Sequence, residues 1–151
     1  MRTYILFLAI CAAGCLSQDE LPHFTSDELA ALLASDSAKS WNLTGRFING
    51  ELVLLECEKD DLLTFGQAAN ALDTAKVTFI TGPALCPGQS DSIIFNGYWF
   101  LSGANNGDSL QYVINGDTSN RSIETITSQW LRLSRSEGPN VVIEEFVLPI
   151  D

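Results

Sequence analysis

The sequence predicts an all-β fold, an eight-stranded antiparallel up-and-down barrel preceded by a short helix. From residue 39 onward, short apolar stretches are separated by turn residues at fairly regular intervals. Several of these stretches place an apolar side chain at every second position, which is the period of a strand with one buried face. Eight or nine such strands in succession suit closure into a barrel, because closure removes the exposed sheet edges.

Length and charge limit what the chain can do. Its 151 residues fit one domain once a targeting segment is removed. The formal net charge is −11, and the few basic residues are scattered without forming a run. Phosphate binding requires clustered lysine and arginine, so nucleic acid is not an expected partner. An acidity of this size is typical of an exported domain that its charge keeps soluble.

The first residues form a targeting segment. Arg2 precedes an apolar run over residues 4–10, and small residues follow up to Gly14. This pattern predicts a signal peptide over residues 1–14, because the apolar run is too short for a permanent membrane helix. The segment that ends at Cys15 also resembles a bacterial lipobox, in which the cysteine thiol carries the diacylglyceryl group. We therefore expect lipidation at Cys15 and a membrane anchor; the alternative is an ordinary cleavage site with an incidental cysteine.

Residues 15–24 are expected to be the lipidated cysteine and a polar tether. The tether contains His23, which is the only histidine of the chain. The usual general base, zinc ligand and catalytic triad are therefore missing. We expect no enzymatic activity, no metal and no other cofactor.

A short helix should follow the tether and begin the barrel domain, which we place at residues 25–151. Thr25 and Glu28 have the spacing of a capping box. Leucines follow at helical spacing up to Leu33, and polar residues begin at Ser35. The helix should therefore lay one apolar face on the barrel.

Apolar stretches and turn signals divide the remaining chain into strands. Residues 41–47 alternate apolar and polar side chains, and Asn49-Gly50 is a strong hairpin signal. Ile123 and Ile126 lie three residues apart and break the alternation of their strand, which predicts a bulge. The predicted strands cover residues 41–47, 52–55, 62–65, 76–80, 97–102, 110–114, 122–127, 129–134 and 141–148.

Several motifs stand in an order that points to a family. The more specific ones are Cys57-x-x-Asp60-Asp61 with Phe65 downstream, and Gly97-x-Trp99. Together with more generic strand motifs, they cover nearly the whole mature domain and resemble the lipocalin-like lipoproteins of Bacteroidota. The resemblance implies a calycin-type, lipocalin-like barrel on a lipid-anchored envelope protein, whose ligand is generally unknown.

Cys57 and Cys86 remain in the body of the chain once the N-terminal cysteines are set aside. An even pair in an exported domain favours a disulfide. A bridge that closes a loop of about thirty residues could stabilise the fold by about 3–4 kcal/mol. The alternative is a reactive thiol pair, but the chain lacks the Cys-x-x-Cys spacing for it.

Residues 56–61 contain the densest group of carboxylates in the chain. Converging carboxylates can bind calcium, but no glycine-containing calcium loop accompanies them. The alternative is a strand corner in which Asp60 or Asp61 accepts hydrogen bonds from backbone N–H groups. A two-carboxylate hydrolase is disfavoured because neighbouring residues on a strand point to opposite faces. We expect residues 56–61 to form a strand corner and not a calcium or hydrolase site.

Five aromatic residues are the candidate ligand-binding residues, because they could line a cavity inside the barrel. A barrel of short strands can equally be filled by its own side chains, in which case the same residues form a packed core. The candidates are Trp41, Phe65, Phe79, Trp99 and Tyr112.

The function expected from these features is binding. We expect a monomeric, lipid-anchored protein of the bacterial cell envelope that holds a small ligand, apolar or aromatic, in its barrel. The alternative is a structural or interaction lipoprotein with a solid barrel, which would act on a glycan or protein partner through its surface.

Overall fold

The computed structural model describes residues 24–69, 73–89, 92–102 and 109–149. The predicted signal peptide over residues 1–14, lipidation at Cys15 and the tether up to His23 lie outside the described residues. Within the described ranges, no helix combines the length and the apolar character needed to span a membrane.

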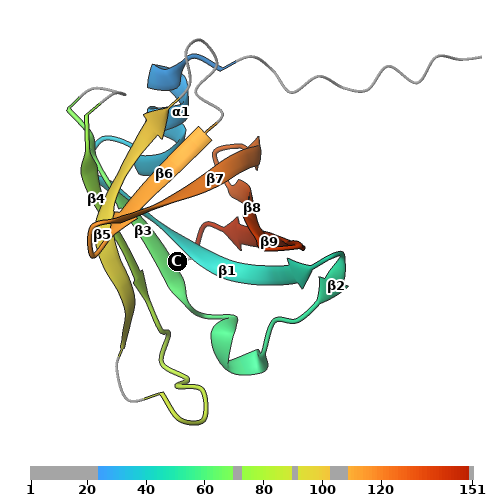
Figure 1. Cartoon of the computed structure of the whole chain (residues 1–151). Helices are drawn as coiled ribbons and strands as arrows, with labels where there is room; N and C mark the ends of the chain where they lie inside the picture. Colours follow the sequence, from blue (N-terminus) through green and yellow to red (C-terminus); the bar gives the residue numbers. More distant parts are fainter. Residues whose placement is uncertain (1–23, 70–72, 90–91, 103–108, 150–151) are drawn as a thin grey trace, which may run out of the picture.

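Eight antiparallel strands close into a barrel in sequential, up-and-down order (Figure 1). Each barrel strand pairs with the next one along the chain, and β1 closes the ring by pairing with β9. The two-residue strand β2 (Glu51–Leu52) lies outside the ring, as a hairpin partner for the end of β1. The predicted all-β barrel is therefore confirmed. Its strands are β1 (Ala38–Ile48), β3 (Leu62–Gly66), β4 (Ala75–Ile80), β5 (Ile93–Ser102), β6 (Ser109–Ile114), β7 (Asp117–Ile126), β8 (Trp130–Glu137) and β9 (Asn140–Val147).

Several strands differ from their predicted extents: β1 and β7 begin three and five residues before their predicted starts, and β8 ends three residues after its predicted end. The apolar run over residues 52–55 forms a strand only at its start, and the chain then leaves the sheet for the 3₁₀ helix η1 (Glu56–Glu58). Leu52 and Leu55 are 65% and 56% exposed and Leu54 is only partly buried against the core, so the run buries little apolar surface, and its described strand pairing is with β1. β5 instead begins four residues before the predicted start at Gly97, because Ile93 to Asn96 also pair with β4.

The helix α1 (Ser26–Ala34) covers one end of the barrel (Figure 1). Its predicted capping box is present: the Glu28 backbone N–H donates to the Thr25 hydroxyl, and the Glu28 carboxylate accepts from the Thr25 backbone N–H. Leu29 and Leu33 are buried against the barrel core. Lys39 Nζ donates to the Leu32 carbonyl at 2.8 Å, which ties the end of the helix to β1.

The barrel interior next to α1 is solid. Trp41 and Trp99 are fully buried there, and Phe65 packs edge-on against Trp99 with ring centroids 5.5 Å apart. Each indole N–H is satisfied: that of Trp41 donates to the Leu33 carbonyl at 3.1 Å, and that of Trp99 donates to a carbonyl of β3 at 3.0 Å. This half of the barrel is packed core, closed by the helix.

A bulge in β1 changes which side chains enter the barrel. The predicted alternation holds up to Leu43, but the register with β9 then shifts between Leu43 and Gly45. Past this point the even-numbered positions point inward, so Arg46 enters the barrel and Phe47 turns outward, against the predicted pattern. A Cβ at Gly45 would stand 2.9 Å from the Phe47 ring, so a larger residue there would force that ring to shift.

Turns and a second bulge follow the sequence signals. Asn49 and Gly50 both have positive φ angles, of 51° and 86°, which is the conformation of a tight Asn-Gly hairpin. The β7–β8 pairing shifts register between Ile123 and Thr125, where the broken alternation predicted a bulge. These local features fix the strand register around the ring.

Candidate functional site

The end of the barrel opposite α1 contains a cavity of about 200 Å³. Every one of the eight barrel strands contributes to its lining, so the cavity is the barrel interior and not a surface depression. The barrel is therefore filled at its helical end and hollow at its other end.

The inner wall of the cavity is aromatic. Phe79 lies between Phe95 and Phe146, with ring centroids 5.5 Å and 6.5 Å away. Tyr112 packs against Phe95 at 5.7 Å, and Leu63 completes this apolar surface. Tilted and edge-on ring pairs of this kind are favourable and hold the wall in shape.

The outer part of the cavity carries a chain of alternating charges. Glu144, which is nearly buried, accepts from Arg46 Nε at 3.2 Å and from an Arg135 terminal nitrogen at 2.6 Å. Arg46 also pairs with Glu58, and Arg135 Nε donates to Glu137 at 2.6 Å. Burial alone would lower the pKa of Arg46, but Glu144 and Glu58 outweigh it and raise this pKa. Each guanidinium in this chain is matched by carboxylates on both sides.

Arg121 stands beside this chain without joining it. Its terminal nitrogen donates to the Ser119 hydroxyl at 2.7 Å and to the Asn120 carbonyl at 3.3 Å, which are neutral acceptors. Its Cζ lies 5.2 Å from the centroid of the Tyr112 ring. No described carboxylate forms an ion pair with it. Burial, and then the nearby positive charge of Arg135, lower the pKa of Arg121.

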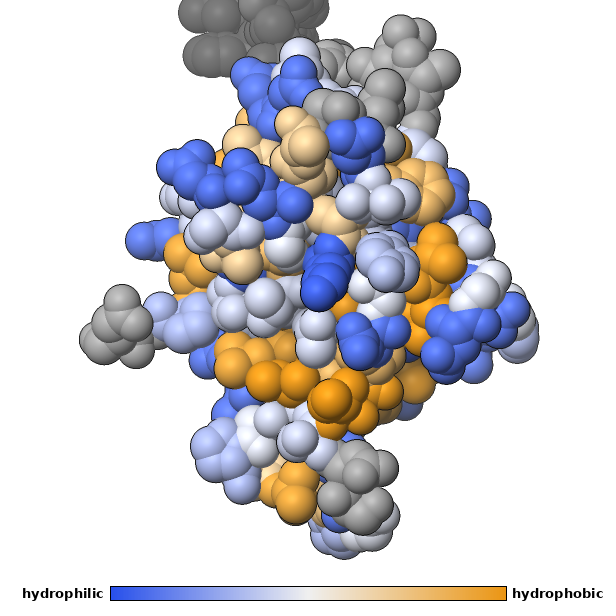
Figure 2. All heavy atoms as spheres, turned by 90° about the vertical axis from the view of Figure 1, so that its left-hand side faces the viewer, coloured by the Kyte–Doolittle hydropathy of each residue, from blue (hydrophilic) through white to orange (hydrophobic). Residues whose placement is uncertain are grey.

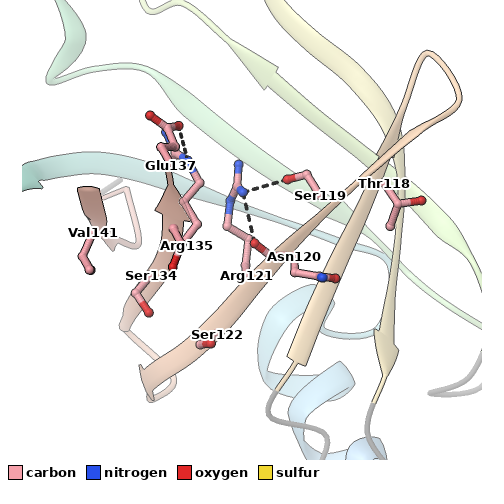
Figure 3. Close-up of a pocket in the computed structure, with 10 residues that line it drawn as sticks. Thr118, Ser119, Asn120, Arg121, Ser122, Ser134, Arg135, Glu137 and Val141 are labelled. Carbon is pink, nitrogen blue, oxygen red and sulfur yellow. Dashed lines mark hydrogen bonds and ion pairs between the residues drawn. The ribbon is translucent and has the colours of Figure 1, made fainter. Parts of the chain in front are cut away.

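A polar cleft opens the barrel wall between β7 and β8 (Figure 3). The two strands pair from Ile126 to Ser122 and separate beyond it, leaving a cleft of about 690 Å³ lined mainly by hydroxyl, amide and charged groups. Figure 3 shows Arg121 on one side of this cleft and Arg135 on the other. Both arginines also line the inner cavity, so they mark where cavity and cleft meet.

The structure divides the five predicted ligand-binding residues into two groups. Phe79 and Tyr112 line the cavity, whereas Trp41, Phe65 and Trp99 lie in the packed core near α1. The sequence reasoning missed the charged residues of the cavity. Gly45 inside a strand was the available signal for the bulge that brings Arg46 inward. Glu144, two positions before the buried Phe146, follows the strand period.

The acidic segment forms a corner, as the sequence predicted. The Asp61 carboxylate is 1% exposed and accepts from the Gly82 backbone N–H at 3.0 Å, and Asp60 accepts from the Ala84 N–H at 3.4 Å. Burial raises the pKa of Asp61. In the part of the chain that the structure describes, no group of three or more histidine, cysteine, aspartate or glutamate side chains could hold a metal.

The Cys57–Cys86 disulfide is present and joins η1 to the segment after β4. It lies at the open end, where exposed apolar side chains occur on three segments: residues 52–55, Leu85, and Ile93 with Ile94. Figure 2 shows apolar side chains forming a band across the lower part of one face of the barrel. The rim of the open end therefore exposes several apolar side chains to solvent.

Comparison with known proteins finds no match to a protein-family model, to a curated protein or to a solved structure.

Proposed function

We propose that this protein is a lipid-anchored binding protein of the cell envelope, which holds a small molecule in the open half of its barrel. The cavity with an aromatic inner wall is the observation that carries the proposal. Small-molecule sites are concave, largely apolar and equipped with a few polar groups that orient the ligand. About 200 Å³ is below the roughly 300–1,000 Å³ of drug-sized ligand sites, so the cavity suits a small molecule or one end of a larger one.

Narrowing the cavity is expected to weaken binding. Ile94 lines the cavity, whereas its neighbour Ile93 does not, and both are exposed at the rim. Ile94→Trp should therefore reduce the affinity for octan-1-ol, used as a neutral apolar probe, by about tenfold or more, which is about 1.4 kcal/mol or more of binding free energy. Backbone amide shifts in an NMR titration give the affinity.

The matched control is Ile93→Trp, which adds the same side chain outside the cavity and should leave the affinity unchanged. Native mass spectrometry of the protein purified from its own host should also show a bound small molecule. If neither octan-1-ol nor a host molecule binds, the proposal is wrong. That outcome would favour an interaction protein whose apolar rim, including Leu52, Leu55 and Leu85, meets a partner.

The anchor is supported by the lipobox-like sequence that ends at Cys15. Two or more acyl chains bind a membrane stably, where one chain binds only marginally. Cys15→Ser should therefore move the protein from the membrane fraction to the soluble fraction, as measured by fractionation and by loss of labelled fatty acid. Cys11→Ser is the control and should remain in the membrane fraction; equal behaviour of the two variants would contradict lipidation at Cys15.

A further inference from the structure

The charges that line the cavity are not balanced within it. Three guanidinium groups and a single carboxylate face the cavity, although the protein as a whole has a formal charge of −11. Glu58 and Glu137 compensate Arg46 and Arg135 from outside the cavity. Arg121 is the cavity guanidinium that forms no ion pair with a described carboxylate. The three arginines and these three glutamates balance in formal charge, but Arg121 itself hydrogen-bonds only to neutral acceptors, so its guanidinium still has room for an acidic partner.

Two polar atoms beside this charge also lack a partner. The Tyr112 hydroxyl and the Arg121 Nε are buried, and no described group forms a hydrogen bond with either. Tyr112 is 2% exposed and lines the cavity. Native proteins satisfy nearly all buried polar groups, through protein, water or ligand atoms. Since both atoms are donors, and the Arg121 fork lies beside the Tyr112 ring, their common partner would be an acceptor.

The surroundings of Arg121 and Tyr112 indicate which parts of that partner are apolar and which are polar. On one side lies the aromatic wall of Phe79, Phe95 and Phe146, which suits an apolar body. On the other side lies the polar β7–β8 cleft, which hydrates a charged end. The change from apolar to polar surroundings occurs at the two arginines shared by cavity and cleft (Figure 3).

We infer, building on the proposed function, that the ligand is an apolar carboxylic acid bound as its anion, with its carboxylate on Arg121 and Tyr112 and its apolar body against the aromatic wall. A carboxylate has two planar oxygens, which match the guanidinium fork and can also accept from a phenol. A cation offers the two unpaired donors no acceptor, and an alcohol offers them one neutral oxygen in place of two charged ones. The apolar wall provides affinity, and the two donors select the charge of the ligand.

The test compares ligands that differ only in their polar end. Octanoate, octan-1-ol and octylammonium share one alkyl chain, so NMR titrations of the full protein isolate the effect of charge. Octanoate should bind about tenfold or more tightly than octan-1-ol, since hydrogen bonds to charged groups are the strong ones. Octylammonium should bind most weakly. In Arg121→Met the preference for octanoate should disappear, and in Arg121→Lys, which keeps the charge, part of it should remain.

Arg132→Met is the matched control. Arg132 also has a buried Nε without a described partner, but it pairs with Glu145 and lines neither the cavity nor the cleft. This variant loses the same charge and should keep the octanoate preference. If octanoate and octan-1-ol bind equally, or if Arg132→Met loses the preference as Arg121→Met does, the anion assignment is wrong while the proposed function stands. If no member of the series binds and no host molecule is found, both are wrong.

Discussion

Trp41→Ala is expected to lower the free energy of unfolding by about 3–5 kcal/mol, the usual cost of truncating a buried tryptophan. Trp41 is fully buried where α1, β1 and the core meet, so little of the space it leaves can collapse. The substitution also removes the donor to the Leu33 carbonyl and the ring beneath Lys39 Nζ, which lies 4.1 Å from its centroid. Helix and barrel are therefore expected to loosen together. Urea denaturation followed by circular dichroism measures the loss.

Trp41→Phe is the matched control, because it keeps an aromatic ring while removing the indole N–H. Its free energy of unfolding should fall by about 1–3 kcal/mol, less than in Trp41→Ala. The loss comes from the smaller ring and from the Leu33 carbonyl, which no longer has its donor. Trp130→Ala, on a side chain that is 45% exposed, should change stability little. A Trp41→Ala protein as stable as the wild type would contradict the assignment of this residue to the packed core.

Reduction of the Cys57–Cys86 disulfide is expected to lower the free energy of unfolding by about 3–4 kcal/mol. The bridge spans 29 residues and therefore restricts a long loop of the unfolded chain. The segment that it holds after β4 has few other contacts to the corner: the hydrogen bonds from Gly82 and Ala84 to the paired aspartates. Denaturation in urea with and without reductant gives the difference, and the slope should rise because the reduced unfolded chain exposes more surface.

The double variant Cys57→Ser/Cys86→Ser is the control for this experiment. It should be about as unstable as the reduced wild type, and addition of reductant should not change it further. If reductant destabilised the double variant by the same amount as the wild type, the effect would not come from this bridge. A loss well under 1 kcal/mol in the wild type would show that the bridge does not restrict the unfolded chain.

Short-range signals were enough to predict the fold. The capping box at Thr25, the Asn49-Gly50 turn and the broken alternation at Ile123 each act over a few residues, and each was found in the structure. Barrel closure followed from the number of strands and from the need to avoid open edges. The strand predicted over residues 52–55 was wrong for most of its length because its formation depends on distant parts of the chain. An apolar run becomes a strand only where a partner strand and a buried face are available.

The residues of the candidate site were harder to predict from the sequence, because the register of the strands decides which side chains point into the barrel. A bulge at Gly45 moves Arg46 from the outer face to the inner one, and a one-residue shift reverses the direction of every later side chain. Arg121 and Arg135 were counted only as scattered basic residues, because they lie 14 positions apart in the chain and meet only across the separated ends of β7 and β8. The aromatic candidates were found as a set, but strand position alone decides which half of the barrel each one occupies.

Because one end of the barrel is packed and the other is hollow, a ligand can reach the cavity from one end only of the described barrel or through the β7–β8 cleft. The described chain begins beside α1, at the sealed end (Figure 1). The cavity lies at the opposite end of the barrel. The mouth is thus the end of the barrel that lies away from the point where the described chain begins. A ligand can then enter the barrel without disturbing the packed core beneath α1. The fraction of loaded protein would follow the dissolved concentration of the ligand relative to its Kd.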